Sequence, residues 1–193
     1  MILHPTPIPG ARLVELERRS DERGFFARTW CQEEFANTGI DVAMVQTSLS
    51  RNVRTGTVRG LHFTWAPSNE AKLVRCEHGA IFDVILDLRP QSPAYLQHYS
   101  LRLDAEQGNA LYIPAGVAHG FQTLLDDSDV LYMMTDYYQP EFAAGVRFND
   151  VAFNITWPRP VTLIAERDRT YPDFDDLRHA LRYRAATGDR PDA

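Results

Sequence analysis

Apolar and polar residues alternate along most of this chain, and the segment 80–88 shows the pattern best. Its even-numbered positions hold Phe82, Val84, Leu86 and Leu88, and its odd-numbered positions from 81 to 87 hold Ile81, Asp83, Ile85 and Asp87. Successive side chains of a β-strand point to opposite faces, so this alternation predicts a strand with two different faces.

Similar short segments recur between groups of turn-forming residues. We expect further strands at 11–17, 24–30, 42–50, 58–65, 72–76, 95–103, 110–113, 121–125 and 130–135. We expect turns at 20–24, 51–56, 78–79, 90–93 and 126–129, and residues 114–116 should interrupt a strand that resumes at 121. Many short strands at fairly regular spacing predict an all-β sandwich or barrel.

Two segments favour helices. Residues 32–37 should form a short helix that packs Phe35 and stops at Gly39. Residues 174–184 should form a second helix, and its expected buried side carries Leu177, Ala180, Leu181 and Tyr183. We expect residues 1–184 to form one domain and residues 185–193 to be a frayed tail.

Composition narrows the function classes. The chain has 193 residues, 44% of them hydrophobic, which suits one packed domain. The net charge of −6 argues against a nucleic-acid binder, which usually carries a basic face. Only Cys31 and Cys76 could form a disulfide, so a disulfide scaffold is not expected. We find no signal peptide and no apolar run long enough for a membrane span, and we expect a cytoplasmic protein without a membrane partner.

Residues 58–63 combine a cation, a glycine and an imidazole in one predicted strand. Arg59 could hold a phosphate group through a bidentate contact, and Gly60 favours a bulge or a close backbone approach. An imidazole ordinarily titrates at about pH 6.5, so His62 could act as a base. A single histidine in a strand is more often structural, so this assignment needs support from other residues.

A metal site is not expected. The chain has six histidines, and none of them forms the H-x-H pair that commonly supplies two ligands in β-barrel metal sites. Other residues could instead act together with His62. His119 is either a core histidine or a second imidazole directed at a ligand, and Asp168 either belongs to a solvated charge cluster or orients a histidine. Tyr132 and Tyr138 supply either core bulk or functional phenols, since a phenol keeps its proton at pH 7 and can act as an acid.

Seven segments of this chain have the order and spacing of motifs found in one known family. They are 58–62 (VRGLH), 72–75 (KLVR), 79–93 (GAIFDVILDLRPQSP), 113–121 (IPAGVAHGF), 132–140 (YMMTDYYQP), 149–150 (ND) and 157–158 (WP). From about residue 21 to residue 168, the chain resembles the dTDP-4-dehydrorhamnose 3,5-epimerase family. The resemblance implies a cupin-like β-jelly roll, a double-stranded sandwich with a few short helices. It also implies a homodimer without metal or other cofactor, acting on a nucleotide-linked 4-keto-6-deoxy sugar.

The resemblance also implies roles for individual residues. His62 resembles the catalytic base, Asp168 its carboxylate partner and Tyr132 the catalytic acid. Residues that resemble the pyrophosphate and sugar contacts are Arg23, Arg59, Lys72 and His119. Tyr138 resembles the residue that stacks on the nucleobase. Gln46, Ser48 and Arg167 are further expected substrate contacts.

The chain departs from the family pattern at four positions, mostly among the nucleotide and sugar contacts. Arg28 replaces the usual Glu, Ser48 the usual Asn, Thr64 a frequent Gln and Ala143 the usual Glu. These departures keep two alternatives open, a 3- or 5-mono-epimerase or a ketoisomerase acting on a related sugar nucleotide. A non-catalytic sugar-nucleotide binding module is a third, although binding alone needs no base and acid.

Overall fold

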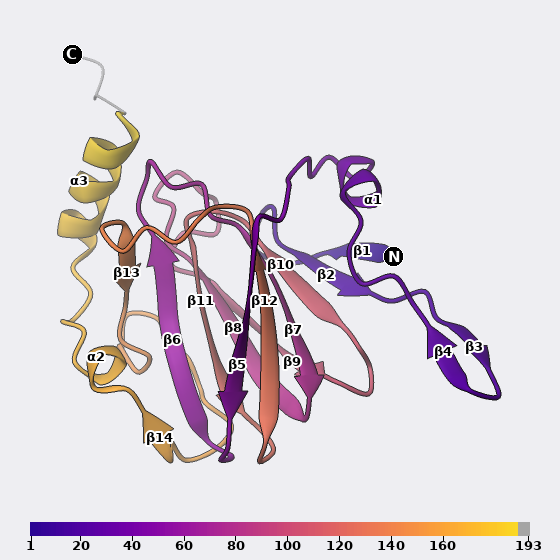
Figure 1. The fold of residues 1–193 in the computed structure, drawn as a ribbon. Coiled ribbons are helices and arrows are strands. Elements are labelled where there is room, and N and C mark those ends of the chain that lie inside the picture. Colours follow the sequence, from indigo (N-terminus) through magenta and orange to yellow (C-terminus); the bar gives the residue numbers. More distant parts are fainter. Residues whose placement is uncertain (189–193) are drawn as a thin grey trace.

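Two mainly antiparallel sheets face each other and enclose the core of the protein (Figure 1). The computed structural model describes residues 1–188. The first sheet has the strand order β1 (Ile2–Pro5), β2 (Arg12–Glu15), β10 (Ala110–Ile113), β7 (Lys72–His78), β12 (Ser128–Met134) and β5 (Gln46–Asn52). The second has the order β13 (Ala143–Gly145), β6 (Thr57–Thr64), β11 (Val117–Thr123), β8 (Ala80–Asp87) and β9 (His98–Asp104), and β14 (Leu163–Ile164) also pairs with β6. The expected all-β jelly-roll sandwich is confirmed.

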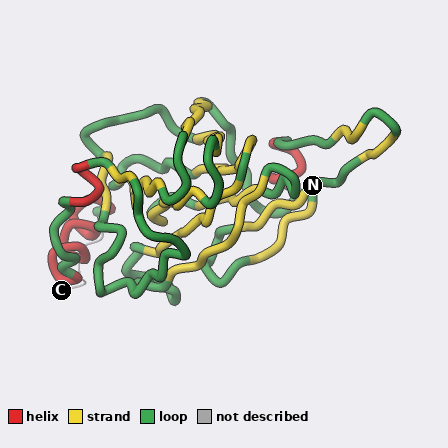
Figure 2. Tube along the Cα trace, turned by 90° about the horizontal axis from the view of Figure 1, so that it is seen from below, coloured by secondary structure: helices red, strands yellow, loops and turns green. Residues whose placement is uncertain are grey.

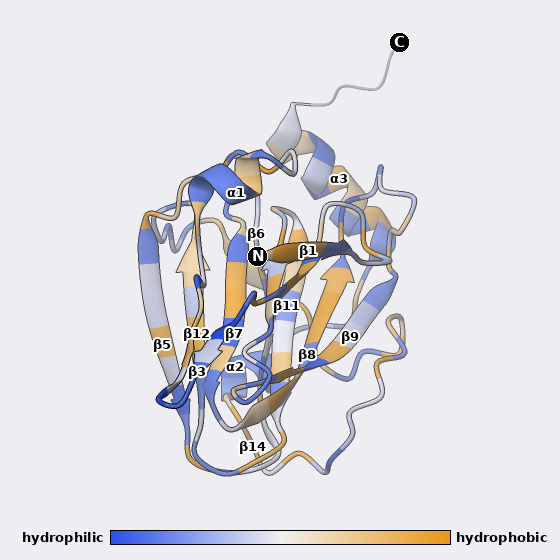
Figure 3. Cartoon of the chain, turned by 90° about the vertical axis from the view of Figure 1, so that its right-hand side faces the viewer, coloured by the Kyte–Doolittle hydropathy of each residue, from blue (hydrophilic) through white to orange (hydrophobic). Residues whose placement is uncertain are grey.

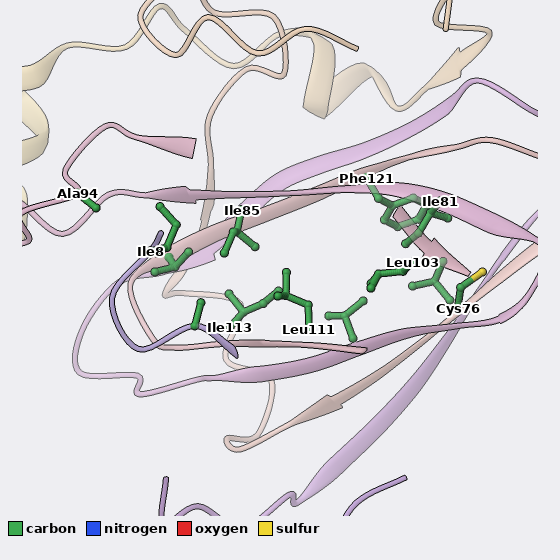
Figure 4. Close-up of a cluster of buried hydrophobic side chains, with 13 residues drawn as sticks. Ile8, Cys76, Ile81, Ile85, Ala94, Leu103, Leu111, Ile113 and Phe121 are labelled. Carbon is green, nitrogen blue, oxygen red and sulfur yellow. The ribbon is translucent and has the colours of Figure 1, made fainter. Parts of the chain in front are cut away.

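The main core lies between the two sheets (Figure 4). The first sheet contributes Val74, Cys76, Leu111, Ile113 and Val130, and the second contributes Ile81, Ile85, Leu103, Val117 and Phe121. The outer face of the second sheet is buried as well, because residues 146–157 and the C-terminal helix cover it. The two faces predicted for segment 80–88 are therefore confirmed. Strand β8 places Ile81 and Ile85 in the main core and Val84 and Leu86 in the outer cluster. Figure 3 shows this strand coloured as largely hydrophobic.

A two-stranded hairpin projects from the body of the sandwich (Figures 1 and 2). It consists of β3 (Arg19–Asp21) and β4 (Gly24–Phe26), followed by the short helix α1 (Gln32–Ala36). The helix and its buried Phe35 are confirmed. The strand expected at 24–30 is wrong beyond Phe26, because the hairpin partner supplies only three pairing residues.

The segment 110–125 is not one interrupted strand, as the sequence predicted. β10 belongs to the first sheet, and the turn at 114–116 carries the chain across to β11 in the second. Therefore His119 lies within a strand and not in a loop. Two other strands extend into expected turns, since β5 and β12 pair along their whole lengths from Gln46–Met134 to Asn52–Ser128.

The C-terminal helix α3 (Asp176–Thr187) faces the protein only in part with the side that was expected: Tyr183 packs against the outer cluster, but the two leucines do not. Its buried residue is His179, whereas Leu177 is 72% exposed and Leu181 is also exposed. His179 donates a hydrogen bond to the carbonyl oxygen of Leu88 at 2.7 Å and packs among aromatic rings, which fixes this orientation. The helix also continues through Thr187, so the predicted tail at 185–193 begins too early, and its residues 189–193 lie outside the described part.

Candidate active site

A bulge in β6 brings two functional candidates to the same face of the second sheet. His62 pairs with His119 of β11, and Arg59 pairs with Phe121. Between these two pairs β11 has one residue and β6 has two. Side chains three positions apart normally point to opposite faces of a strand, and the additional residue turns Arg59 and His62 to the same side.

Gly60 makes this bulge possible. Its φ of +103° lies in a region that side chains disfavour, and a Cβ at this position would lie 2.6 Å from the carbonyl oxygen of His119 and 2.8 Å from Cα of Gly120. Only a residue without a side chain fits between the two strands. The bulge or close approach predicted for Gly60 is confirmed.

The short helix α2 (Glu166–Arg169), which the sequence did not predict, places Asp168 behind His62. Asp168 Oδ1 lies 2.8 Å from Nε2 of His62, and Asp168 Oδ2 accepts a hydrogen bond from the Gly60 N–H at 3.0 Å. Burial of this carboxyl opposes its ionisation, but the hydrogen bonds from His62, Gly60 and Arg167 outweigh burial and lower its pKa to about 2. An ionised Asp168 can therefore hold the imidazole of His62.

The contacts of His62 leave one ring nitrogen for a ligand. Both Asp168 and Arg167 approach Nε2, the latter with Nη2 at 3.0 Å. Nδ1 is then the nitrogen available for chemistry, and the side chain remains 36% exposed. A histidine oriented in this way by a buried carboxylate has the arrangement of a general base.

Tyr132 lines the same cavity from the opposite sheet. In the register of the first sheet it lies beside Ser48 and Val74, and the next inward-facing row contains Gln46, Met134 and Lys72. Burial and the nearby Asp83 carboxylate raise the pKa of the Tyr132 phenol well above its usual value, against a smaller opposing effect of Arg59. Tyr132 is therefore held in its protonated form.

The cavity between these walls has a volume of about 490 Å³. Seven of the predicted site residues line it: Gln46, Ser48, His62, Lys72, Tyr132, Tyr138 and Arg167. Arg59 lies in an adjoining hollow that shares His62 and Arg167 with the cavity. Gln46 also accepts a hydrogen bond from the backbone N–H of Tyr138 at 3.1 Å, which fixes that tyrosine at the rim.

His119 does not line this cavity. It is 4% exposed, its Nε2 lies 2.7 Å from Asp83 Oδ1, and its ring packs edge-on against Tyr132 with centroids 5.7 Å apart. The structure therefore places His119 behind Tyr132, and its predicted contact with the substrate stays a prediction.

Arg23 also does not line the cavity of its own chain. It lies at the tip of the β3–β4 hairpin, where it pairs with Asp21 at 2.6 Å and is largely exposed. Arg28 follows the same hairpin and pairs with Glu34 at 2.6 Å. The substrate roles predicted for this region stay predictions.

Sequence analysis overlooked several residues in the cavity wall, of which Glu70 and Tyr171 are polar. The spacing of Glu70 and Lys72 was a usable signal, because residues two apart in an extended segment point the same way. Tyr171 follows an unpredicted helix and gave no such signal. Three of the four departures from the family pattern, Ser48, Thr64 and Ala143, line the wall, and Thr64 and Ala143 are direct neighbours on β6 and β13.

No group of three or more potential metal ligands occurs among residues 1–188. Within the same range no helix is long and apolar enough to cross a membrane.

Comparison with known proteins agrees with this fold. The family model described as dTDP-4-dehydrorhamnose 3,5-epimerase matches residues 5–176. An enzyme of that name from Sinorhizobium fredii is 37% identical over 184 residues, which cover 95% of this chain and 94% of the relative. The crystal structure of the Bacillus anthracis enzyme with TDP and PPi bound has a TM-score of 0.87 and 35% identity, covering 90% of this chain and 99% of that one. A 3'-monoepimerase from Streptomyces bikiniensis in complex with dTDP-quinovose has a TM-score of 0.84 and 32% identity, covering 93% and 89%. This chain belongs to the dTDP-4-dehydrorhamnose 3,5-epimerase family.

Proposed function

We propose that this protein epimerises a nucleotide-linked 4-keto-6-deoxy sugar, as a dTDP-4-dehydrorhamnose 3,5-epimerase does. One observation carries the proposal: a carboxylate-oriented histidine and a protonated tyrosine line opposite walls of one cavity. Inversion at a carbon needs a proton to leave from one face and another to arrive at the opposite face. His62 and Tyr132 come from different sheets, which supports the assignment of one of these steps to each of them.

The hydrogens on carbons beside a ketone are acidic because the resulting anion delocalises onto the ketone oxygen. Nδ1 of His62 removes such a proton, and Asp168 stabilises the imidazolium that forms. The negative charge moves to the C4 oxygen, where the ammonium group of Lys72 stabilises it. The Tyr132 hydroxyl then donates its proton to the carbon from the other face. Solvent later reprotonates the phenolate and takes the proton from the His62 imidazolium, so both groups return to their starting state. Both C3 and C5 flank the ketone, so one site can act on two carbons.

The remaining predicted contacts would hold the nucleotide diphosphate. Arg59 and Arg167 provide guanidinium groups beside His62, in a protein whose net charge is −6. A local cluster of cations can attract an anionic substrate against an overall negative field. Tyr138 is exposed at the rim, where its ring can stack on a base, and Gln46 and Ser48 supply polar groups nearby.

A panel of 4-keto sugar nucleotides, followed by NMR in heavy water, tests this function. We expect deuterium at both C3 and C5, together with inverted product. Deuterium at one carbon alone would favour the mono-epimerase alternative, and a ketone that moves along the sugar would favour the ketoisomerase. Tight binding without any deuterium uptake would overturn the proposal in favour of a binding module.

We further infer that the protein is a homodimer. The projecting β3–β4 hairpin exposes Phe25 and Phe26, which a second copy of the chain could cover. A hairpin that reaches a second copy would also let Arg23 approach a substrate, as the resemblance implies. Light scattering should give twice the chain mass of 22.0 kDa, and Phe26→Ser should lower it towards one chain. A single-chain mass for the wild type at all concentrations would contradict the inference.

The expected cytoplasmic location also stays a prediction.

A further inference from the structure

One carboxylate in the cavity wall has no part in the reaction described above. Glu70 lies two residues before Lys72, the first residue of β7, and its Oε1 lies 2.7 Å from Nζ of Lys72. The two side chains are 10% and 13% exposed, respectively, so the ion pair is largely removed from solvent. Among the described residues that line the cavity, Glu70 is the single acidic one.

A carboxylate at this position is unfavourable for substrate binding by itself. The proposed substrate carries a diphosphate, and a second negative charge in the same cavity repels it. Burial of an unpaired charge is also costly, and only a close partner of opposite sign compensates for it. Lys72 is that partner, so the pair adds almost no net charge to the cavity.

The pair separates the roles of the cations. The charge of Lys72 is already matched, whereas Arg59 donates hydrogen bonds only to neutral acceptors, the side-chain oxygen of Asn52 at 2.7 Å and the carbonyl oxygen of Arg51 at 3.3 Å. No carboxylate within residues 1–188 forms an ion pair with Arg59. The uncompensated guanidinium is the better phosphate ligand. Lys72 has three N–H donors and gives at most one to Glu70, which leaves donors for a neutral oxygen that becomes negative during the reaction.

We propose, on the basis of the function inferred above, that Glu70 is a positioning residue that holds the Lys72 ammonium towards the C4 oxygen of the sugar. A lysine side chain has four rotatable bonds, and without a fixed partner its ammonium would turn towards the diphosphate. Glu70 thereby reserves Lys72 for the enolate and leaves the diphosphate to the uncompensated Arg59.

The test is Glu70→Gln, which keeps size and shape and removes the charge. We expect kcat and the rate of deuterium uptake to fall together by about 10- to 100-fold, with KM changed less than about threefold, because a stabilising interaction of the transition state is weakened. The Kd of the nucleoside diphosphate alone should not rise in Glu70→Gln, because the freed ammonium of Lys72 can turn towards the diphosphate, but it should rise in Arg59→Ala. In the Lys72→Met background, Glu70→Gln should cause no further loss, since the residues act as a unit.

The control is Glu77→Gln. Glu77 forms the same kind of pair with Arg75, 2.7 Å apart and two residues away, on the outer face of the same strand. This variant should behave as the wild type. If Glu70→Gln does not fold, Glu70→Asp replaces it in the test. This variant should also lower kcat, but by a smaller factor.

Three results would each overturn the role of Glu70. In Glu70→Gln alone, these are a raised KM with unchanged kcat, or kinetics equal to those of the wild type. The third is that Glu70→Gln lowers kcat in the Lys72→Met background as much as it does in the wild type. The wild type serves as the reference for function: if it takes up no deuterium, the proposed function fails and the role of Glu70 with it. If the wild type exchanges normally, an unaffected Glu70→Gln rejects only the positioning role.

Discussion

His62 and His119 are direct partners on the adjacent strands β6 and β11, and each contacts a different aspartate. The two pairs have nearly equal lengths, 2.8 Å to Asp168 and 2.7 Å to Asp83. They differ in access, because His62 is 36% exposed in the cavity and His119 is 4% exposed behind Tyr132. A base must reach its substrate, so the difference in exposure, rather than the hydrogen bond, identifies His62 as the candidate.

The bulge that turns His62 into the cavity should be sensitive to substitution at Gly60. Gly60→Ala places a Cβ against two backbone atoms and imposes a disfavoured φ, which alone costs about 1–3 kcal/mol. We expect a lower free energy of unfolding in urea and loss of activity. Gly39→Ala is the control, since Gly39 has a φ of +86° but no atom within 4 Å of the added Cβ. Equal losses in the two variants would show that the crowding at Gly60 is unimportant.

The depressed pKa of Asp168 should make stability depend on pH. Its folded-state pKa of about 2 is below the usual 3.8, so ionised Asp168 stabilises the fold above about pH 4, and this contribution is lost as the pH falls towards 2. The difference corresponds to about 2 kcal/mol. The free energy of unfolding of the wild type minus that of Asp168→Asn should therefore shrink between pH 4 and pH 2. A difference that stays constant over this range would contradict the assignment.

Arg59→Ala should weaken substrate binding and raise KM more than it lowers kcat, because a phosphate contact is similar in the ground and transition states. Steady-state kinetics with the best substrate of the panel measures this. Arg51→Ala is the matched control, since Arg51 is an exposed arginine of β5 paired with Asp127 and Asp129. An unchanged KM for Arg59→Ala would remove Arg59 from the diphosphate site.

Prolonged treatment with a chelator should leave the activity unchanged. The proposed reaction uses side chains alone, and residues 1–188 contain no group of three potential ligands that could hold a metal ion. Activity before and after dialysis against chelator is the measurement. Loss of activity with chelator and its recovery on adding a divalent cation would refute this prediction.

Local patterns predicted the strands well where pairing and burial follow the alternation, as in β8. Local patterns failed where the length of the neighbouring strand decides where a strand ends. β4 ends early because its hairpin partner is short, and β5 continues into a predicted turn because β12 pairs with it throughout. The predicted buried side of α3 was only partly right for a related reason, since the aromatic surroundings of His179, which include Tyr183, decided the orientation and not the leucines.

The site was predicted mainly through family motifs, which named seven residues that line the cavity. Sequence alone could not show that His62 reaches the cavity whereas His119 is buried behind Tyr132, because it predicted His119 outside a strand. The two-residue spacing of Glu70 and Lys72 indicated only that their side chains point the same way, and the importance of Glu70 arises from its distance of 2.7 Å to Lys72. The resemblance named Asp168 as the carboxylate partner of His62, but the distance of 2.8 Å between them and the buried position of Asp168 required the folded structure.

The first half of the proposed proton transfer can be tested with His62→Ala. If His62 is the base, this variant should stop both epimerisation and uptake of deuterium from heavy water, because no enolate forms. Circular dichroism should show an intact fold, since the side chain is partly exposed and its removal leaves the main core untouched. Normal deuterium uptake by a folded His62→Ala would assign the base to another group.

The second half depends on Tyr132. Tyr132→Phe removes the hydroxyl and keeps the ring that packs against His119, so the fold should persist. His62 can still form the enolate and return a proton from its own side. The variant should therefore exchange substrate hydrogen for deuterium but lose about 10²–10⁴-fold in epimerisation, the usual contribution of a general acid. Tyr137→Phe, which alters an exposed tyrosine outside the cavity, should behave as the wild type. Near-normal epimerisation by Tyr132→Phe would assign the acid to another group, and loss of deuterium exchange as well would mean that Tyr132 helps to form the enolate.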